Sequence, residues 1–235
     1  MGISNLKARY DRNFNTLSIE EQQKLGSSKV IIIGLGGLGG SVCEMLARTG
    51  VGHLTLIDGD VFEASNLNRQ LLCQENLIGF PKAQAAKNRV NDINSQVKVR
   101  CYIEYVDESN LYDHIKDADV VMDCLDTIDT RFMLQKAAEK ASIPIVSGAI
   151  AGVAGQVTTI FPQDKGYELI YGKKGRHQST GVETKTGNMA HCALFVAALQ
   201  SSECLKLLLD RGDLLRNKLL IAELWTNTFE IMDLV

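Results

Sequence analysis

Residues 30–40 read VIIIGLGGLGG, and this stretch decides the fold. Four apolar residues, typical of a buried strand, run directly into a turn where Gly34, Gly36 and Gly39 satisfy the pattern G-x-G-x-x-G. Glycine permits a tight turn and lets backbone N–H groups approach a phosphate, and the positive end of the following helix adds to the attraction. The stretch therefore predicts a strand, a phosphate-binding turn and a helix.

A second apolar strand is predicted at 54–57 and ends at Asp58, nineteen residues after Gly39. Dinucleotide-binding folds place an acid that hydrogen-bonds a ribose hydroxyl at about this distance. The spacing favours a nucleotide, but NAD-dependent dehydrogenases share it, so the chemistry stays open at this point. Asp60 is also close, although an acid of the turn is the simpler interpretation for it.

Three further polar residues bear on the choice of nucleotide. Arg69 lies in SNLNRQ, and a guanidinium group matches phosphate oxygens bidentately. Lys82 falls in the first turn of a predicted helix, where a cation is unfavourable for the helix dipole and indicates another purpose. Asp126 follows an apolar strand at the edge where open α/β sheets build their sites, and one carboxylate with phosphate oxygens and water can hold Mg²⁺.

In combination and order, five motifs resemble the MoeB/ThiF/HesA family, the prokaryotic relatives of ubiquitin-activating enzymes. The motifs are RYDRN (9–13), GLGGLGG (34–40), DGDVFEASNLNRQ (58–70), GFPKAQAA (79–86) and DCLDTIDTR (123–131). The resemblance covers nearly the whole chain. It implies an adenylyltransferase that uses ATP and Mg²⁺ to activate the C-terminal carboxylate of a ubiquitin-fold sulfur carrier ending in Gly-Gly, with release of pyrophosphate.

The resemblance also implies roles for individual residues. Arg12, the second arginine of R-Y-x-R, would reach the ATP of a neighbouring subunit, which makes the expected active unit a homodimer with Arg12 acting in trans. On its residues alone, Arg12 would be a solvated charge. Arg131 either shapes the site near Asp126 or forms an ion pair on its helix. The predicted catalytic residues are Arg12, Arg69, Lys82 and Asp126; the predicted nucleotide-binding residues are Gly36, Gly37, Asp58, Asn66, Arg69, Lys82 and Asp126, with Asp126 also the metal ligand.

The acceptor is less constrained than the nucleotide. The region 163–186 corresponds to the family's crossover loop, and it is polar, glycine-rich and richer in cations than in acids. A cationic loop suits an acidic carrier, or equally a carboxylate on a small molecule or on tRNA, and a solvated loop is as good an interpretation. An NAD(P) oxidoreductase and an inactive binding module are further alternatives, but neither gives Arg69, Lys82 and Asp126 a shared purpose.

The six cysteines show where the chain departs from its relatives. None forms a C-x-x-C pair, whereas many family members carry two such pairs that hold zinc, so we expect no structural zinc. Cys192 and Cys204 fall on an apolar predicted helix, which favours buried packing over a thioester or persulfide role. Unpaired cysteines and a polar N-terminus favour a cytoplasmic protein.

Strands and helices alternate through the first two thirds of the chain and predict an α/β fold. We expect a single adenylation domain over 1–235, Rossmann-like and doubly wound, with a mostly parallel sheet, an additional C-terminal antiparallel part and a helical arm at 1–28.

The net charge of −3 disfavours a general nucleic-acid surface, and no apolar run of membrane length is apparent. Strands are predicted at 30–33, 54–57, 97–103, 119–122, 143–146, 155–161, 219–224 and 228–234, and helices at 18–25, 38–49, 81–93, 130–141 and 189–209.

Overall fold

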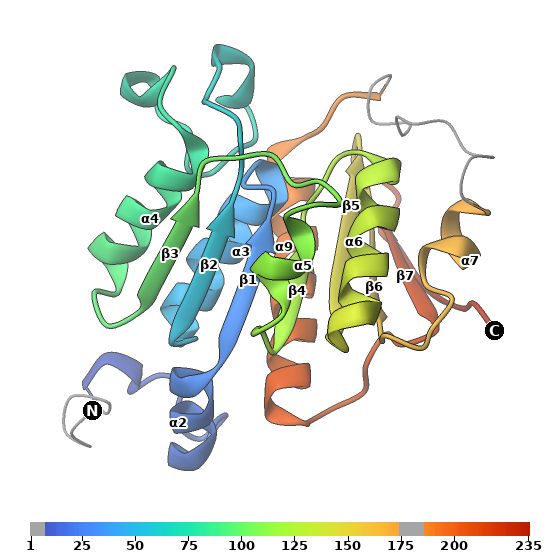
Figure 1. The fold of residues 1–235 in the computed structure, drawn as a ribbon, viewed down its shortest axis with the longest axis horizontal. Coiled ribbons are helices and arrows are strands. Elements are labelled where there is room, and N and C mark those ends of the chain that lie inside the picture. Colours follow the sequence, from blue (N-terminus) through green and yellow to red (C-terminus); the bar gives the residue numbers. More distant parts are fainter. Residues whose placement is uncertain (1–7, 174–185) are drawn as a thin grey trace.

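The computed structural model describes residues 8–173 and 186–235, and its strands form one sheet in the order β3-β2-β1-β4-β5-β6-β7-β8 (Figure 1). The first five strands in this order pair in parallel. They are β1 (Lys29–Ile33), β2 (His53–Ile57), β3 (Lys98–Tyr102), β4 (Val120–Asp123) and β5 (Ile145–Ala151). Because β1 lies between β2 and β4, the chain reverses its direction of winding there, and ligands bind at such a point.

The other three strands are antiparallel and complete the sheet. They are β6 (Ala154–Ile160), β7 (Lys218–Glu223) and β8 (Thr228–Asp233). The mixed sheet confirms the predicted fold class, including its C-terminal antiparallel part. Strand β8 forms the outer edge, and all six of its residues are exposed.

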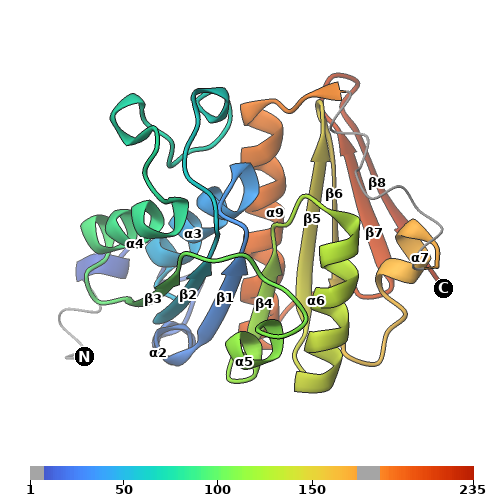
Figure 2. The ribbon, with the colours of Figure 1, turned by 45° about the horizontal axis from the view of Figure 1, so that its top comes forward.

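Helices cover both faces of the parallel strands (Figures 1 and 2). One face carries α3 (Gly37–Thr49), α4 (Lys82–Ile93) and α9 (Ala190–Leu209). The opposite face carries α5 (Leu111–Ile115) and α6 (Ile128–Ala141). This arrangement explains the continuous apolar runs in the sequence, because a parallel strand covered on both faces has no polar side.

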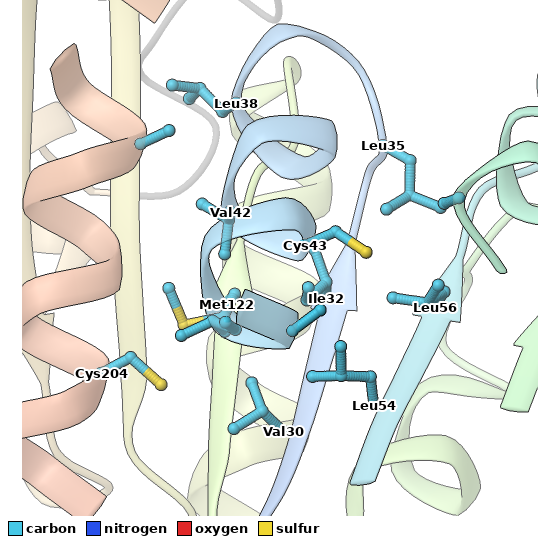
Figure 3. Packing of buried hydrophobic residues seen from close by; sticks show 14 of the residues in the cluster. Val30, Ile32, Leu35, Leu38, Val42, Cys43, Leu54, Leu56, Met122 and Cys204 are labelled. Atoms are coloured by element: carbon cyan, nitrogen blue, oxygen red, sulfur yellow. The ribbon is translucent and has the colours of Figure 1, made fainter. Parts of the chain in front are cut away.

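The side chains of β1 show how the two cores divide. Val30 and Ile32 belong to a cluster with α3 and α9, which Figure 3 shows from close by. Ile31 and Ile33 belong to the cluster on the α6 face. Successive side chains of a strand point to opposite faces, so β1 anchors both cores and holds the glycine turn after it rigidly.

The N-terminal helix α2 (Ile19–Ser27) begins as expected but ends differently. Its N-cap Ser18 and Glu21 form a capping box, with Ser18 Oγ accepting from the Glu21 N–H at 3.1 Å. The predicted end at residue 25 is two residues early, because the helix continues to Ser27 and the extended Ser28 caps it.

The region 163–186 is not wholly irregular, which corrects the expectation for it. A short helix, α7 (Tyr167–Tyr171), lies within it and packs on α6, while residues 174–185 lie outside the described part. Gly166 at its N-cap has φ of +53°, a left-handed conformation that glycine tolerates. Half of this predicted loop is therefore anchored structure.

Within the described residues, α9 is long and apolar enough to cross a membrane by length and composition alone. It instead packs against α3 and the centre of the sheet. Two of its buried polar side chains form hydrogen bonds with other parts of the protein. Gln200 donates to the Asp123 carbonyl at 2.9 Å, and Glu203 accepts from the Thr159 hydroxyl at 2.6 Å. These contacts identify α9 as a core helix of this fold.

Candidate functional site

One cavity of about 1080 Å³ opens where β1, β2 and β4 end, at the top of the sheet in Figure 1. Its walls contain residues from four of the five motifs, scattered in the sequence from the glycine turn to the loop after β4. All seven predicted nucleotide-binding residues line it: Gly36, Gly37, Asp58, Asn66, Arg69, Lys82 and Asp126. The predicted convergence is thus present, and the role of each residue stays a prediction.

The glycine turn packs directly against the loop after β4. Gly34 has φ of +84°, and a Cβ there would lie 2.6 Å from the Cys124 carbonyl oxygen. A Cβ on Gly39 would lie 1.8 Å from the Gly34 carbonyl oxygen, so neither position tolerates a side chain. Because Gly36 is the N-cap of α3, no capping side chain occupies the first N–H groups of that helix. These groups can bind an anion.

Asp58 braces this turn from β2. Its Oδ2 accepts from the Leu35 N–H at 2.6 Å, and its Oδ1 accepts from the Asp60 N–H at 2.8 Å. Burial raises the pKa of Asp58 above its ordinary value, although these hydrogen bonds and the charge of Lys82 reduce the rise. The second lone pair of each oxygen remains available, so the predicted ribose contact is compatible with this bracing role.

Lys82 begins α4 and lies almost fully buried beside Asp60. Its Nζ lies 2.8 Å from Asp60 Oδ2, and Tyr105 donates its hydroxyl to Asp60 Oδ1 at 2.7 Å. Burial opposes ionisation of Asp60, but the hydrogen bonds from Lys82 and Tyr105 hold its pKa below the ordinary value. Asp60 is therefore an acid of the turn that also pairs with Lys82 and Tyr105, and neither partner was predicted from the sequence.

Replacing Asp60 by Asn is expected to make the protein depend more on nucleotide for its stability. Lys82 would lose its anion, which should cost about 1 kcal/mol of unfolding free energy because Asp60 is half exposed. A bound triphosphate would restore the missing negative charge, so MgATP should raise the melting temperature more in Asp60→Asn than in the wild type. Thermal unfolding with and without MgATP measures this difference.

Asp113→Asn is the matched control, since Asp113 pairs with Lys116 on an exposed helix face. This variant should respond to MgATP as the wild type does. An equal response in Asp60→Asn would show that Lys82 does not exchange Asp60 for phosphate.

Arg69 lies in the cavity wall and is held from its own turn. Its Nη1 donates to the Ser65 carbonyl at 3.1 Å and to Asn68 Oδ1 at 3.0 Å. Asn68 in turn donates to the Asn188 carbonyl at 3.2 Å, just before α9 begins. The buried Asn66 fixes the same turn by accepting from the Glu63 N–H at 3.1 Å. The arginine is therefore preorganised beside the glycine turn.

Asp126 also lines the cavity and is exposed, in the loop after β4. Among the described residues, no group of three or more His, Cys, Asp or Glu side chains could hold a metal ion by itself. An isolated carboxylate in a phosphate site still fits Mg²⁺, which usually takes one or two carboxylates and completes its shell with phosphate oxygens and water.

Arg131 is buried and shapes the loop near Asp126, as predicted, but its ion pair is with Asp123 at the end of β4 and not with a residue of its own helix. Its Nη1 pairs with Asp123 Oδ2 at 2.6 Å, and its Nη2 donates to the carbonyls of Leu125 at 2.5 Å and Gly148 at 2.9 Å. It therefore forms an ion pair and also shapes the loop that carries Asp126. Sequence analysis did not find its partner Asp123.

Arg12 lies away from this cavity. Its side chain is 99% exposed, and the acid that it approaches within the described residues is Asp11, at 4.0 Å. The segment before α2 lies at the amino-terminal ends of the strands in Figure 1, whereas the residues that line the cavity follow their carboxyl ends. Arg12 therefore cannot contact a nucleotide in its own subunit, and its action in trans stays a prediction.

Cys192 and Cys204 are fully buried, which confirms the predicted packing of both side chains. Burial raises the pKa of each thiol, so neither is poised as a thiolate. Cys43, beneath the glycine turn, is likewise buried, and burial raises its pKa to about 12.

Comparison with curated proteins finds relatives over almost the full chain. It is 35% identical over 224 residues to the SAMP-activating enzyme E1 of Haloferax volcanii, covering 94% of this chain and 83% of the relative. It is 33% identical over 231 residues to the molybdopterin-synthase adenylyltransferase of Escherichia coli, covering 97% of this chain and 92% of the relative. It also spans about half the length of a Drosophila pseudoobscura adenylyltransferase and sulfurtransferase, MOCS3-1, at 34% identity. The predicted enzyme class, an adenylyltransferase, is thereby confirmed.

Solved structures and a family model agree with these relatives. Escherichia coli MccB has the same fold, with a TM-score of 0.85 and 24% identity over 99% of this chain and 71% of that chain. The model of the ThiF family matches residues 10–234. The chain therefore belongs to the ThiF family.

Proposed function

We propose that this chain is an ATP-dependent adenylyltransferase that activates the C-terminal carboxylate of a ubiquitin-fold sulfur carrier and releases pyrophosphate. One observation carries the proposal: the glycine turn, Asp58, Arg69, Lys82 and Asp126 line a single cavity. A nicotinamide cofactor would leave the two cations and Asp126 without a common role. A triphosphate uses them all, because guanidinium and ammonium groups bind its oxygens and Asp126 can hold its metal.

The geometry suits an in-line displacement. A carboxylate oxygen of the acceptor forms a bond to the α-phosphorus of ATP, the bond from that phosphorus to the bridging oxygen breaks, and pyrophosphate leaves. Negative charge on the phosphate oxygens is stabilised by Arg69, by Lys82 and by the N–H groups that open α3. Mg²⁺ at Asp126 would supply further charge neutralisation. No side chain has to act as a nucleophile.

The cavity extends past the nucleotide end to the hairpin of β5 and β6. Small residues line this part, among them Ala149, Ala154 and Gly155. Two buried amide oxygens of other wall residues, Gln70 Oε1 and Asn188 Oδ1, lack a hydrogen-bond partner within the described structure. Small side chains in the wall leave room for an extended peptide backbone, and peptide N–H groups would satisfy such oxygens. These features favour a glycine-ended tail over a bulky tRNA-borne carboxylate.

The names of the relatives support the same acceptor class, since one activates SAMP and another serves molybdopterin synthase. We place the enzyme in the cytoplasm, in keeping with its six free cysteines.

Radiolabelled pyrophosphate exchange into ATP, measured with candidate acceptors, tests the proposal. Exchange should require Mg²⁺ and a carrier that ends in Gly-Gly, and a carrier lacking its last glycine should not support it. Exchange driven instead by a small carboxylic acid or by tRNA would move the assignment to one of those acceptors. NADH binding without any exchange would contradict it.

The proposed homodimer places Arg12 of one subunit at the ATP of the other, and two inactive variants can test this. Arg12→Ala and Asp126→Asn should each lose pyrophosphate exchange. Mixed and reassembled together, they should recover about a quarter of wild-type activity, because random pairing gives half heterodimers, each with one intact site. Mixing Arg69→Ala with Asp126→Asn is the control and should recover nothing, since both defects lie in the same cavity.

A further inference from the structure

The carboxylate of Asp123 is the centre of a buried hydrogen-bond network behind the cavity. Asp123 is the last residue of β4 and is fully buried. Its Oδ2 accepts from Arg131 Nη1 at 2.6 Å, from Ser147 Oγ at 2.6 Å and from the Tyr167 hydroxyl at 2.5 Å. Its Oδ1 accepts from the Leu125 N–H at 3.0 Å. Four elements of the fold thus meet on one anion.

This network controls the peptide unit immediately before Asp126. Leu125 is held by its N–H through Asp123 and by its carbonyl through Arg131. The preceding Cys124 carbonyl lies against Gly34, where even a Cβ would be only 2.6 Å away. The loop therefore has little freedom, and a shift of the Asp123 carboxylate would move Asp126 relative to the glycine turn.

Tyr167 differs from the other donors because it comes from α7, beyond the parallel part of the sheet. Its side chain is fully buried, and burial raises its pKa well above the ordinary value, so the hydroxyl is a proton donor. Other contacts anchor α7 independently. Gln135 accepts from the Tyr167 N–H at 2.9 Å, and Arg216 pairs with Asp164 at 2.8 Å just before the helix. Loss of the hydroxyl alone would leave α7 in place.

We propose that Tyr167 is a positioning residue: its hydroxyl fixes the Asp123 carboxylate, which with Arg131 holds Asp126 at the distance from the glycine turn that MgATP requires. The inference rests on the proposed function in one respect, the assignment of Asp126 to the metal of MgATP. It adds that α7 supports the proposed metal ligand Asp126 through a buried contact of Tyr167, without touching the nucleotide.

Tyr167→Phe tests the proposal, because it removes only the hydroxyl. Calorimetric titration should show MgATP binding weakened about tenfold, as is typical when a group supporting a metal ligand is lost. Binding of ATP in EDTA should be unchanged, since it depends on the glycine turn, Arg69 and Lys82. The kcat for pyrophosphate exchange should fall by a similar factor, while the KM for the acceptor stays the same.

Tyr112→Phe is the matched control. Tyr112 lies on α5, on the same face of the sheet, and its ring contacts Lys140 outside the network. This variant should bind MgATP as the wild type does. A Tyr167→Phe protein with a lower melting temperature but wild-type MgATP affinity and kcat would show a purely structural role and overturn the proposal. Wild-type protein that binds MgATP but exchanges no pyrophosphate with any carboxylate would contradict the proposed function instead.

Discussion

Asp123→Ala is expected to lose about 3–5 kcal/mol of unfolding free energy, the cost of breaking a buried ion pair by removing one partner. Arg131 is 4% exposed and would remain charged without an anion. Ser147, Tyr167 and the Leu125 N–H would also lose their acceptor. Because a domain of this kind is stabilised by only about 5–15 kcal/mol, this loss would be a large share of its total stability.

Urea unfolding followed by far-ultraviolet circular dichroism measures this loss. Asp113→Ala removes an exposed acid paired with Lys116 and serves as the control, with a loss below about 0.5 kcal/mol expected. The double variant Asp123→Leu with Arg131→Met should lose no more unfolding free energy than Asp123→Ala alone, because the double variant leaves no unpaired buried charge. A loss of less than about 1 kcal/mol in Asp123→Ala would show that water or another anion compensates for the carboxylate.

Local patterns were sufficient for most of the fold. The two strands that flank the glycine turn, β1 and β2, are mostly apolar because helices cover both faces of the sheet, and each begins one residue before its predicted start. The short helix α7 was missed for a physical reason. A helix of five residues has little stability of its own, and this one depends on contacts of Tyr167 with residues distant in sequence.

The nucleotide side of the site was predictable because it is built from contiguous motifs at fixed spacing. The supporting residues were not, since Asp123 and Tyr167 lie 44 positions apart and neither carries a local signal of its partner. Asp60 could have been found. A lysine in the first turn of a helix opposes the dipole, and a nearby acid is the natural compensation for it.

Arg69→Ala is expected to reduce pyrophosphate exchange by about 10²–10³-fold, the usual effect of losing one preorganised group that stabilises charge in a transition state. The guanidinium group lies in the cavity wall, where Ser65 and Asn68 already orient it, so its contribution is made without further ordering. The fold should be unaffected, because Arg69 makes none of the buried contacts of the core. Exchange kinetics and a urea unfolding curve on the same preparation separate the two effects.

Two further variants sharpen this test. Arg69→Lys keeps the positive charge but cannot form bidentate hydrogen bonds with phosphate, so this variant should retain only part of the exchange activity. Arg100→Ala removes an exposed cation on β3, outside the cavity, and should exchange pyrophosphate at the wild-type rate. If Arg69→Ala also exchanged at that rate, the arginine would have no contact with phosphate. Arg69 and Lys82 are the two cations that favour a triphosphate over a nicotinamide cofactor. Without Arg69, Lys82 alone would support a triphosphate, and Asp60 already neutralises its charge.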